Sequence, residues 1–336
     1  MDLVFVLLMY HAGFDRISCM DIEELVLELS TQIQRVVKPH LGKIASRASS
    51  GQAVGGDTTF VIDDIAEEMV HSLLKKSGDV AYYSEDKGLV VFGKPRYVLI
   101  VDPIDGTRPA AAGFESCCVS IAASPYLENP KMGDILYSAV HEIKTDTIFL
   151  AKKQGGVRIE RNGQSQPIVL SPNQELSALF WTAGFRGRPA RALVTVLAGL
   201  IDTSSVDGGF FELGSVSFSL TRLVTGQLDA CVDIGKRLID EAAWMSGEFS
   251  RVGKGNILNN NPYDVAAAFL VVVEAGGVVT DGYGKSLDEC PLLGSGIDYQ
   301  FSLIAASNAA LHSKVLSEVN KGIEGLKKMP ALPSQT

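Results

Sequence analysis

Residues 100–107 read IVDPIDGT, and they begin within an apolar run at 97–101 that predicts a β-strand stopping at Asp102. Asp102 and Asp105 stand three residues apart on a turn that proline and glycine favour, so their carboxylates can converge on one hard cation. Between them, Ile104 can offer only its carbonyl oxygen. A plain turn is typical of the same residue types, and these eight residues alone leave both interpretations open.

Three further acidic residues lie where apolar segments begin or end. Glu85 follows the short apolar run at 80–83, Asp63 opens a predicted helix, and Asp264 opens another. Each of them taken singly is explained equally well as a helix N-cap or a solvated strand end. With the two aspartates above they make five carboxylates. Because a phosphate ester is itself anionic, such a cluster would repel it unless metal cations lay between them.

The chain resembles the inositol monophosphatase-like family of magnesium-dependent, lithium-sensitive phosphomonoesterases in four pieces that occur in the family's order. These pieces are DTTFVIDDIAEEM at 57–69, SED at 84–86, IVDPIDGT at 100–107 and DVAAAFLVVVEAGGVVTD at 264–281. A fifth piece, GSVSFSLTRLVTGQLDACVDIG at 214–235, is similar to the family's substrate-side helix and strand. The resemblance spans most of residues 20–320 and implies an α+β fold, a layered αβαβα sandwich of the inositol monophosphatase/fructose-1,6-bisphosphatase type.

The resemblance also implies metal ligands. Glu85, Asp102 and the Ile104 carbonyl would bind one Mg²⁺. A second Mg²⁺ would be bound by Asp102, Asp105 and Asp264, with Asp102 bridging the two, and Glu85 would touch a third, weakly held ion. We therefore expect two or three Mg²⁺ per site. Such a pair of ions clamps the attacking and leaving oxygens of an in-line displacement.

The catalytic residues implied by the resemblance are Asp63, Thr107 and Glu85. Asp63 and Thr107 match the pair that orients and polarises the attacking water. The backbone N–H groups of Gly106 and Thr107 would meet the phosphate at a helix N-terminus. Beyond this point relatives carry an asparagine and an aromatic residue, whereas this chain has RPA at 108–110, so the segment that enters the pocket differs.

On the substrate side the resemblance places Gly214, Ser215 and Val216, and it puts Asp233 where relatives contact substrate hydroxyls. A polar insertion at 236–261 follows. It begins with Lys236 and Arg237, which are cations suited to a second phosphate. A solvated basic loop explains each of these two residues equally well.

These features predict a phosphoric monoester hydrolase that acts on a small sugar or inositol phosphate, inositol 1-phosphate and/or fructose 1,6-bisphosphate, through metal-activated water. Two alternative substrates stay open, 3′-phosphoadenosine 5′-phosphate and histidinol phosphate. A catalytically silent member that binds metal or sugar phosphate is a further alternative. From the family we also expect inhibition by lithium, a cytoplasmic location and a homodimer.

Composition limits the other classes of function. The chain has 336 residues, 46% of them hydrophobic, which is enough for a sizeable core. Its formal net charge of -9 argues against a nucleic-acid partner. No uncharged apolar run is long enough to span a bilayer, so we expect a soluble protein without a membrane partner. The five cysteines show no metal-binding or disulfide spacing.

We expect two halves, residues 20–170 with most metal ligands and residues 171–325 with the substrate side, between an extension at 1–19 and a tail at 326–336. Apolar periodicity predicts helices near 21–47, 63–76, 191–201, 216–225 and 265–275. Strands are expected at 97–101, 118–122, 135–140, 147–151, 178–183, 228–234 and 278–280. The Gly/Ser-rich stretch at 49–56 predicts a loop.

Overall fold

An eight-stranded sheet forms the N-terminal half of the computed structural model, which describes residues 21–53 and 56–328. Its strand order is β10-β9-β8-β7-β6-β5-β3-β4. Only β3 and β5 pair in parallel, and the other neighbours are antiparallel. The strands are β3 (Val80–Ser84), β4 (Gly88–Phe92), β5 (Tyr97–Asp105), β6 (Cys118–Pro125), β7 (Tyr137–Glu142), β8 (Thr147–Lys152), β9 (Gly156–Arg161) and β10 (Gln164–Gln166).

A five-stranded sheet forms the C-terminal half, in the order β12-β11-β13-β15-β14. The first three strands in this order run parallel, and β15 and β14 run antiparallel to their neighbours. The strands are β11 (Phe180–Ala183), β12 (Gly209–Phe211), β13 (Ala230–Asp233), β14 (Val278–Asp281) and β15 (Leu303–Ala306). The change of sheet between β10 and β11 falls near residue 170, where the sequence predicts the boundary between its two halves.

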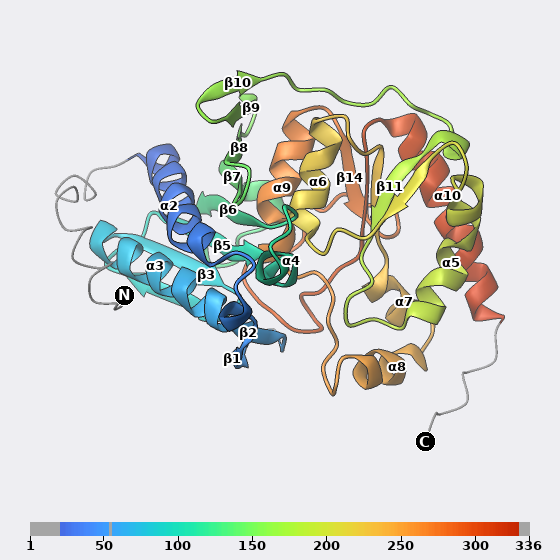
Figure 1. Cartoon of the computed structure of the whole chain (residues 1–336), viewed down its shortest axis with the longest axis horizontal. Coiled ribbons are helices and arrows are strands. Elements are labelled where there is room, and N and C mark those ends of the chain that lie inside the picture. Colours follow the sequence, from blue (N-terminus) through green and yellow to red (C-terminus); the bar gives the residue numbers. More distant parts are fainter. Residues whose placement is uncertain (1–20, 54–55, 329–336) are drawn as a thin grey trace.

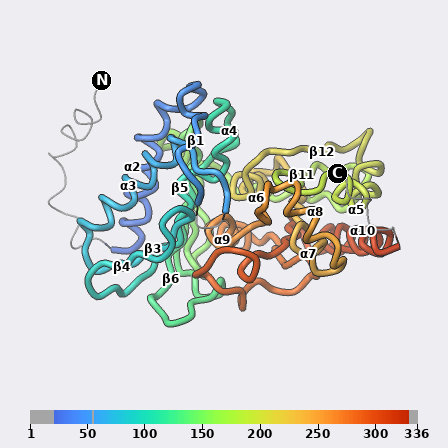
Figure 2. Tube along the Cα trace, turned by 90° about the horizontal axis from the view of Figure 1, so that it is seen from below, coloured from blue at the N-terminus to red at the C-terminus, as the bar shows by residue number. Residues whose placement is uncertain are grey.

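Helices lie on both outer faces and between the sheets, so the molecule has five layers, αβαβα (Figure 1). The outer layer on the N-terminal half is α2 (Ile22–Val37) with α3 (Val61–Ser77), and the outer layer on the C-terminal half is α5 (Ala190–Thr203) with α10 (Ala309–Lys327). Between the sheets pack α6 (Val216–Val224) and α9 (Pro262–Glu274). Seen from below, the two halves stand side by side with α9 near their junction (Figure 2). The predicted sandwich is confirmed.

The sequence explains why these helices take these layers. In α2, residues such as Leu25, Leu29 and Ile33 recur at helical spacing and are buried, while the opposite side stays exposed, so one stripe faces the sheet. In α9, every residue from Val265 to Val272 is apolar and buried. A helix that is apolar all round needs cover on both sides, and its position between two sheets supplies that cover.

Three expectations about local structure need correction. The helix expected near 21–47 ends at Val37, just before Pro39, and short 3-10 helices follow at Lys38–His40 and Ile44–Arg47. The stretch predicted as a loop at 49–56 contains β1 (Ser49–Gln52), which pairs antiparallel with β2 (Thr58–Phe60). All four residues of β1 are exposed, so no alternation of apolar and polar residues announces this strand. The insertion at 236–261 is not a plain polar loop, because it contains all but the first residue of α7 (Gly235–Glu241) and the whole of α8 (Met245–Val252).

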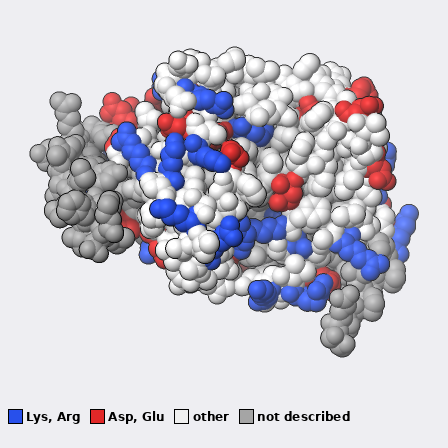
Figure 3. All heavy atoms as spheres, in the orientation of Figure 1, with Lys and Arg blue, Asp and Glu red and all other residues white. Residues whose placement is uncertain are grey.

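The predicted extension at 1–19 and most of the tail at 326–336 lie outside the described residues. Among residues 21–53 and 56–328, no helix combines the length and the apolar character that a bilayer crossing requires. On the face drawn in Figure 3, basic and acidic side chains lie among many uncharged ones, so the acidic excess of the chain is not concentrated there.

Candidate active site

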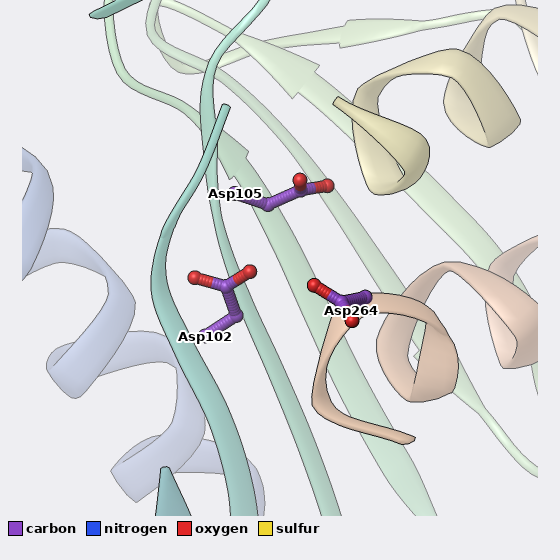
Figure 4. Close-up of side chains that lie close together, drawn as sticks. All are labelled: Asp102, Asp105 and Asp264. Atoms are coloured by element: carbon purple, nitrogen blue, oxygen red, sulfur yellow. The ribbon is translucent and has the colours of Figure 1, made fainter. Parts of the chain in front are cut away.

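Three aspartates from two distant segments meet at the junction of the halves. Asp102 and Asp105 belong to the end of β5, and Asp264 lies in the first turn of α9. One carboxylate oxygen from each lies within 4.8 Å of the others, and Figure 4 shows the three side chains turned toward a common space.

A bulge in β5 turns its two aspartates to one side. Residues three apart in a regular strand point to opposite faces of the sheet. Here Asp102 faces Ser120 of β6 and Asp105 faces Cys118, so three steps along β5 match only two along β6. The extra residue re-aims the side chains beyond it, which is the usual effect of a β-bulge. The segment between the two aspartates therefore belongs to β5, and it does not form the plain turn that the sequence also allowed.

Each of the three aspartates has one oxygen held by the backbone and one free for a ligand. Asp102 Oδ1 accepts from the Ile104 N–H at 3.0 Å. Asp105 Oδ2 accepts from the Ser217 N–H at 2.6 Å and from the Ser215 hydroxyl at 2.8 Å. Asp264 Oδ2 accepts from the Asn261 N–H at 2.6 Å.

The hydrogen bond from the Asn261 N–H to Asp264 also shows how α9 begins. Asp264 is not its N-cap, because Asn261 stands at that position and Asp264 occupies the third residue of the helix. Its carboxylate reaches back to the cap N–H, which fixes the side-chain rotamer and directs Oδ1 toward β5.

The electrostatics of the cluster favour a bound cation. Burial, followed by repulsion from neighbouring carboxylates, raises the pKa of Asp264 to about 8 and holds the pKa of Asp102 well above its usual range. Burial also raises the pKa of Asp105 to about 6, against its bonds to Ser215 and Ser217. A divalent cation would relieve this repulsion, and an all-oxygen donor set is the kind that hard cations prefer.

Glu85 and Ile104 lie beside the aspartates. Glu85 follows β3, and burial, then the charge of Asp264, raises its pKa well above the ordinary value. Its oxygens are not part of the group that lies within 4.8 Å. The Ile104 carbonyl oxygen lies 3.1 Å from the Thr107 hydroxyl oxygen and is an alternative acceptor for its single proton. The structure thus brings three of the five predicted ligands into one cluster and places the other two at its edge.

Asp63 and Thr107 form a pair across two segments. The Thr107 hydroxyl lies 3.0 Å from Asp63 Oδ1, and Asp63 Oδ2 accepts from the Phe60 N–H at 2.8 Å. Asp63 stands at the third residue of α3, so it is not the N-cap either. Burial raises the pKa of its carboxyl to about 7, although the bonds from Phe60 and Thr107 oppose this shift.

Gly106 joins the aspartates to Thr107 in a conformation that a side chain would prevent. Its φ is 90°, in the left-handed region. A Cβ here would lie 2.5 Å from the Ser116 carbonyl oxygen and 2.9 Å from Ser215 Cβ. Glycine therefore allows the chain to turn from β5 into the short helix α4 (Thr107–Ala112) while it packs against Ser215.

A pocket opens next to the aspartates and is lined by both halves of the molecule. Asp105 and Asp264 contribute to its wall, and so do four predicted substrate-side residues, Gly214, Ser215, Val216 and Asp233.

Lys236 and Arg237 do not line this pocket. Lys236 pairs with Asp240 at 2.5 Å, one turn along α7. Arg237 is buried, donates to the Gly282 carbonyl at 2.6 Å and lies over the Tyr283 ring. Because both side chains are engaged elsewhere, the structure gives no support to the expectation that they bind substrate.

Two arginines that the sequence analysis missed line the pocket instead. Arg186 and Arg188 lie in the turn between β11 and α5. Their place in the sequence could have indicated a role in binding. Both arginines follow β11, which pairs in parallel with its neighbours, and ligands often bind at the carboxyl ends of parallel strands.

Arg186 forms an ion pair with Asp57, which also accepts from Arg108 at 3.2 Å. Burial of Asp57 opposes its ionisation, but the two guanidinium groups outweigh burial and lower its pKa to about 2. Arg108 is the first residue of the RPA segment at 108–110, where the resemblance implies a departure from the family's pattern. Its guanidinium also lies 5.5 Å from the centre of the Phe60 ring.

Comparison with known proteins supplies the family context. A family model described as "Inositol monophosphatase family" matches residues 21–324. The fructose-1,6-bisphosphatase/inositol-1-monophosphatase of Methanothermobacter thermautotrophicus is 26% identical over 301 residues, which are 87% of this chain and 94% of that protein.

The bifunctional NADP phosphatase/NAD kinase of Methanococcus maripaludis is 26% identical over 314 residues, covering 88% of this chain. The chain spans about half, 49%, of that relative's length. Among solved structures, an IMPase of Thermotoga maritima superposes with a TM-score of 0.65 at 21% identity, covering 91% of this chain and 100% of that one. This likeness shows that the two chains share a fold.

Proposed function

The chain belongs to the inositol monophosphatase family and is a phosphatase, and we propose that it hydrolyses a small sugar or inositol phosphate with the aid of bound Mg²⁺. The observation that carries the proposal is the convergence of Asp102, Asp105 and Asp264, each with one oxygen tied to the backbone and one left for a ligand. Carboxylates prearranged in this way bind a cation without first losing side-chain freedom.

Asp102, Asp105 and Asp264 would hold the metal, with Glu85 and the Ile104 carbonyl beside them as further oxygen ligands. The donor set fits a hard divalent cation, because it contains only oxygen and is strongly acidic. When bound, such ions supply positive charge that polarises the phosphate and lowers the pKa of a water molecule.

The protein's own contribution to the attack lies in Thr107 and Asp63. With its proton donated to Asp63, the Thr107 oxygen keeps lone pairs that can accept a hydrogen bond from a water molecule. Asp63 is held from both sides, by the Phe60 N–H and by Thr107, so it keeps the hydroxyl in one orientation. This pair therefore orients the water and provides a carboxylate that takes up its proton.

The substrate's alcohol would occupy the pocket between the aspartates and the turn that carries Arg186. We propose inositol 1-phosphate and fructose 1,6-bisphosphate as the first substrates to test, in line with the activities named for the Methanothermobacter relative. Inhibition by lithium, a homodimer and a cytoplasmic location stay predictions.

The test is phosphate release from each substrate with Mg²⁺, with EDTA, and with Mg²⁺ plus Li⁺. An Asp102→Asn protein, purified in the same way, controls for contaminating phosphatases. We expect Mg²⁺-dependent release by the wild type and none by the variant. Absence of release from both substrates and from 3′-phosphoadenosine 5′-phosphate and histidinol phosphate would contradict the proposal. Release that EDTA does not reduce would contradict the role of the metal.

A further inference from the structure

A buried ion pair forms part of the pocket wall that faces the aspartate cluster. Arg188 Nη1 donates to Asp233 Oδ2 at 2.6 Å, and the two side chains are only 6% and 5% exposed. Both residues line the pocket. We propose that Arg188 is a positioning residue, which holds Asp233 so that its other oxygen, Oδ1, accepts a hydrogen bond from a hydroxyl of the substrate. This inference rests on the proposed function and on the hydroxyl contact of Asp233 that the resemblance implies, and it adds the residue that orients Asp233.

Arg188 is fixed by three segments of the chain. Besides Asp233 at the end of β13, it donates from Nη1 to the Gly184 carbonyl at 3.0 Å and from Nε to the Leu258 carbonyl at 3.2 Å. The rigid guanidinium plane allows these bonds to form together, whereas a lysine ammonium has no such fork. Since Gly184, Asp233 and Leu258 all line the pocket, Arg188 ties together the wall on which the alcohol would rest.

Two glycines make room for the pair. A Cβ on Gly184 would lie 2.8 Å from Arg188 Nη1 and equally 2.8 Å from Asp233 Oδ2. A Cβ on Gly235 would lie 2.0 Å from Asn259 Oδ1 and 3.0 Å from Arg188 Nε. Neither glycine has a positive φ, so the backbone conformation does not require glycine at these positions. The close approach of the ion pair requires glycine at 184, and Asn259 together with Arg188 requires it at 235.

The pairing decides which chemistry Asp233 can recognise. Oδ2 is occupied by Arg188, and Oδ1 has only a long contact of 3.4 Å from the Gly235 N–H. An ionised carboxylate can only accept, so the partner of Oδ1 must be a donor such as a hydroxyl. The pair carries no net charge, and a second phosphate would gain nothing from an arginine that is already neutralised. This part of the wall therefore selects a polyhydroxylated alcohol.

The test compares a substrate that has hydroxyls beside its phosphate, inositol 1-phosphate, with one that has none, 4-nitrophenyl phosphate. Arg188→Lys should raise KM for inositol 1-phosphate by about tenfold, the effect of losing one well-placed hydrogen bond, with kcat within about twofold. Both constants for 4-nitrophenyl phosphate should stay within about twofold. Asp233→Asn should show the same selectivity, and the double variant should be no worse than the more affected single variant.

Arg191→Lys, an exposed arginine in the first turn of α5, is the matched control and should resemble the wild type. Equal losses on both substrates would mean that Arg188 only maintains the fold, and would overturn the inference. So would an unchanged KM for inositol 1-phosphate in Asp233→Asn, or additive effects in the double variant. If Arg188→Lys does not fold, Arg188→Gln takes its place in the same comparison, and it should show the same selective rise in KM for inositol 1-phosphate. A wild type inactive on inositol 1-phosphate, fructose 1,6-bisphosphate, 3′-phosphoadenosine 5′-phosphate and histidinol phosphate would refute the proposed function itself, and the inference with it.

Discussion

Replacement of Asp63 by asparagine should stabilise the metal-free protein at alkaline pH and remove most of its activity. The reason is the burial of this carboxyl beside Thr107, which raises its pKa from an ordinary 3.8 to about 7. A carboxyl with a raised pKa in the folded state contributes stability that is complete below its unfolded pKa. This contribution is lost as the pH rises from about 4 through about 7.

The magnitude follows from the shift of about three pKa units. Each unit corresponds to about 1.4 kcal/mol, so ionised Asp63 costs the folded protein about 4 kcal/mol at pH 8.5 and about 2 kcal/mol at pH 5. Asparagine cannot accept from both the Phe60 N–H and Thr107, and the loss of one such bond costs about 1–2 kcal/mol. The net gain should therefore be about 2 kcal/mol at pH 8.5 and near zero at pH 5.

The assay is denaturant unfolding in EDTA at both pH values. Asp64→Asn is the matched control, because Asp64 is the exposed neighbour on the same helix and its replacement should change stability by no more than about 0.5 kcal/mol. With Mg²⁺ present, Asp63→Asn should lower kcat about a hundredfold or more, since it removes the group that we propose takes the water's proton. No gain at pH 8.5, or the same gain at both pH values, would refute the electrostatic reasoning.

Two further substitutions test the separate roles of the site. Asp102→Asn should reduce phosphate release to the background rate and weaken Mg²⁺ binding measured by calorimetry, because it removes one of the three carboxylates that converge in the cluster. A near-normal rate would contradict the metal assignment. Thr107→Ala should lower kcat about a hundredfold with little change in KM, while Thr107→Ser keeps the hydroxyl and most of the rate; a change in KM alone would assign Thr107 to ground-state binding.

Much of the fold is visible in the sequence, because element type depends on local periodicity. Helix α2 has apolar residues along one side only, so one face must be covered. Helix α9 is apolar all round, so it must be covered on both sides. The polar hairpin of β1 and β2 carries no such pattern, since all four residues of β1 are exposed. Backbone pairing alone makes it a hairpin.

By itself, the sequence predicted three carboxylates that the structure brings together, because Asp102, Asp105 and Asp264 stand in recognisable motifs next to apolar elements. Only the tertiary structure decided which cations face the pocket. Lys236 and Arg237 lie close to Asp233 in sequence, yet they contact Asp240 and Gly282. Arg188, which binds Asp233, belongs to a turn that is distant in the sequence. A long side chain can reach in many directions from its backbone position. The partner it finds therefore depends on how separate elements pack and not on the residues beside it.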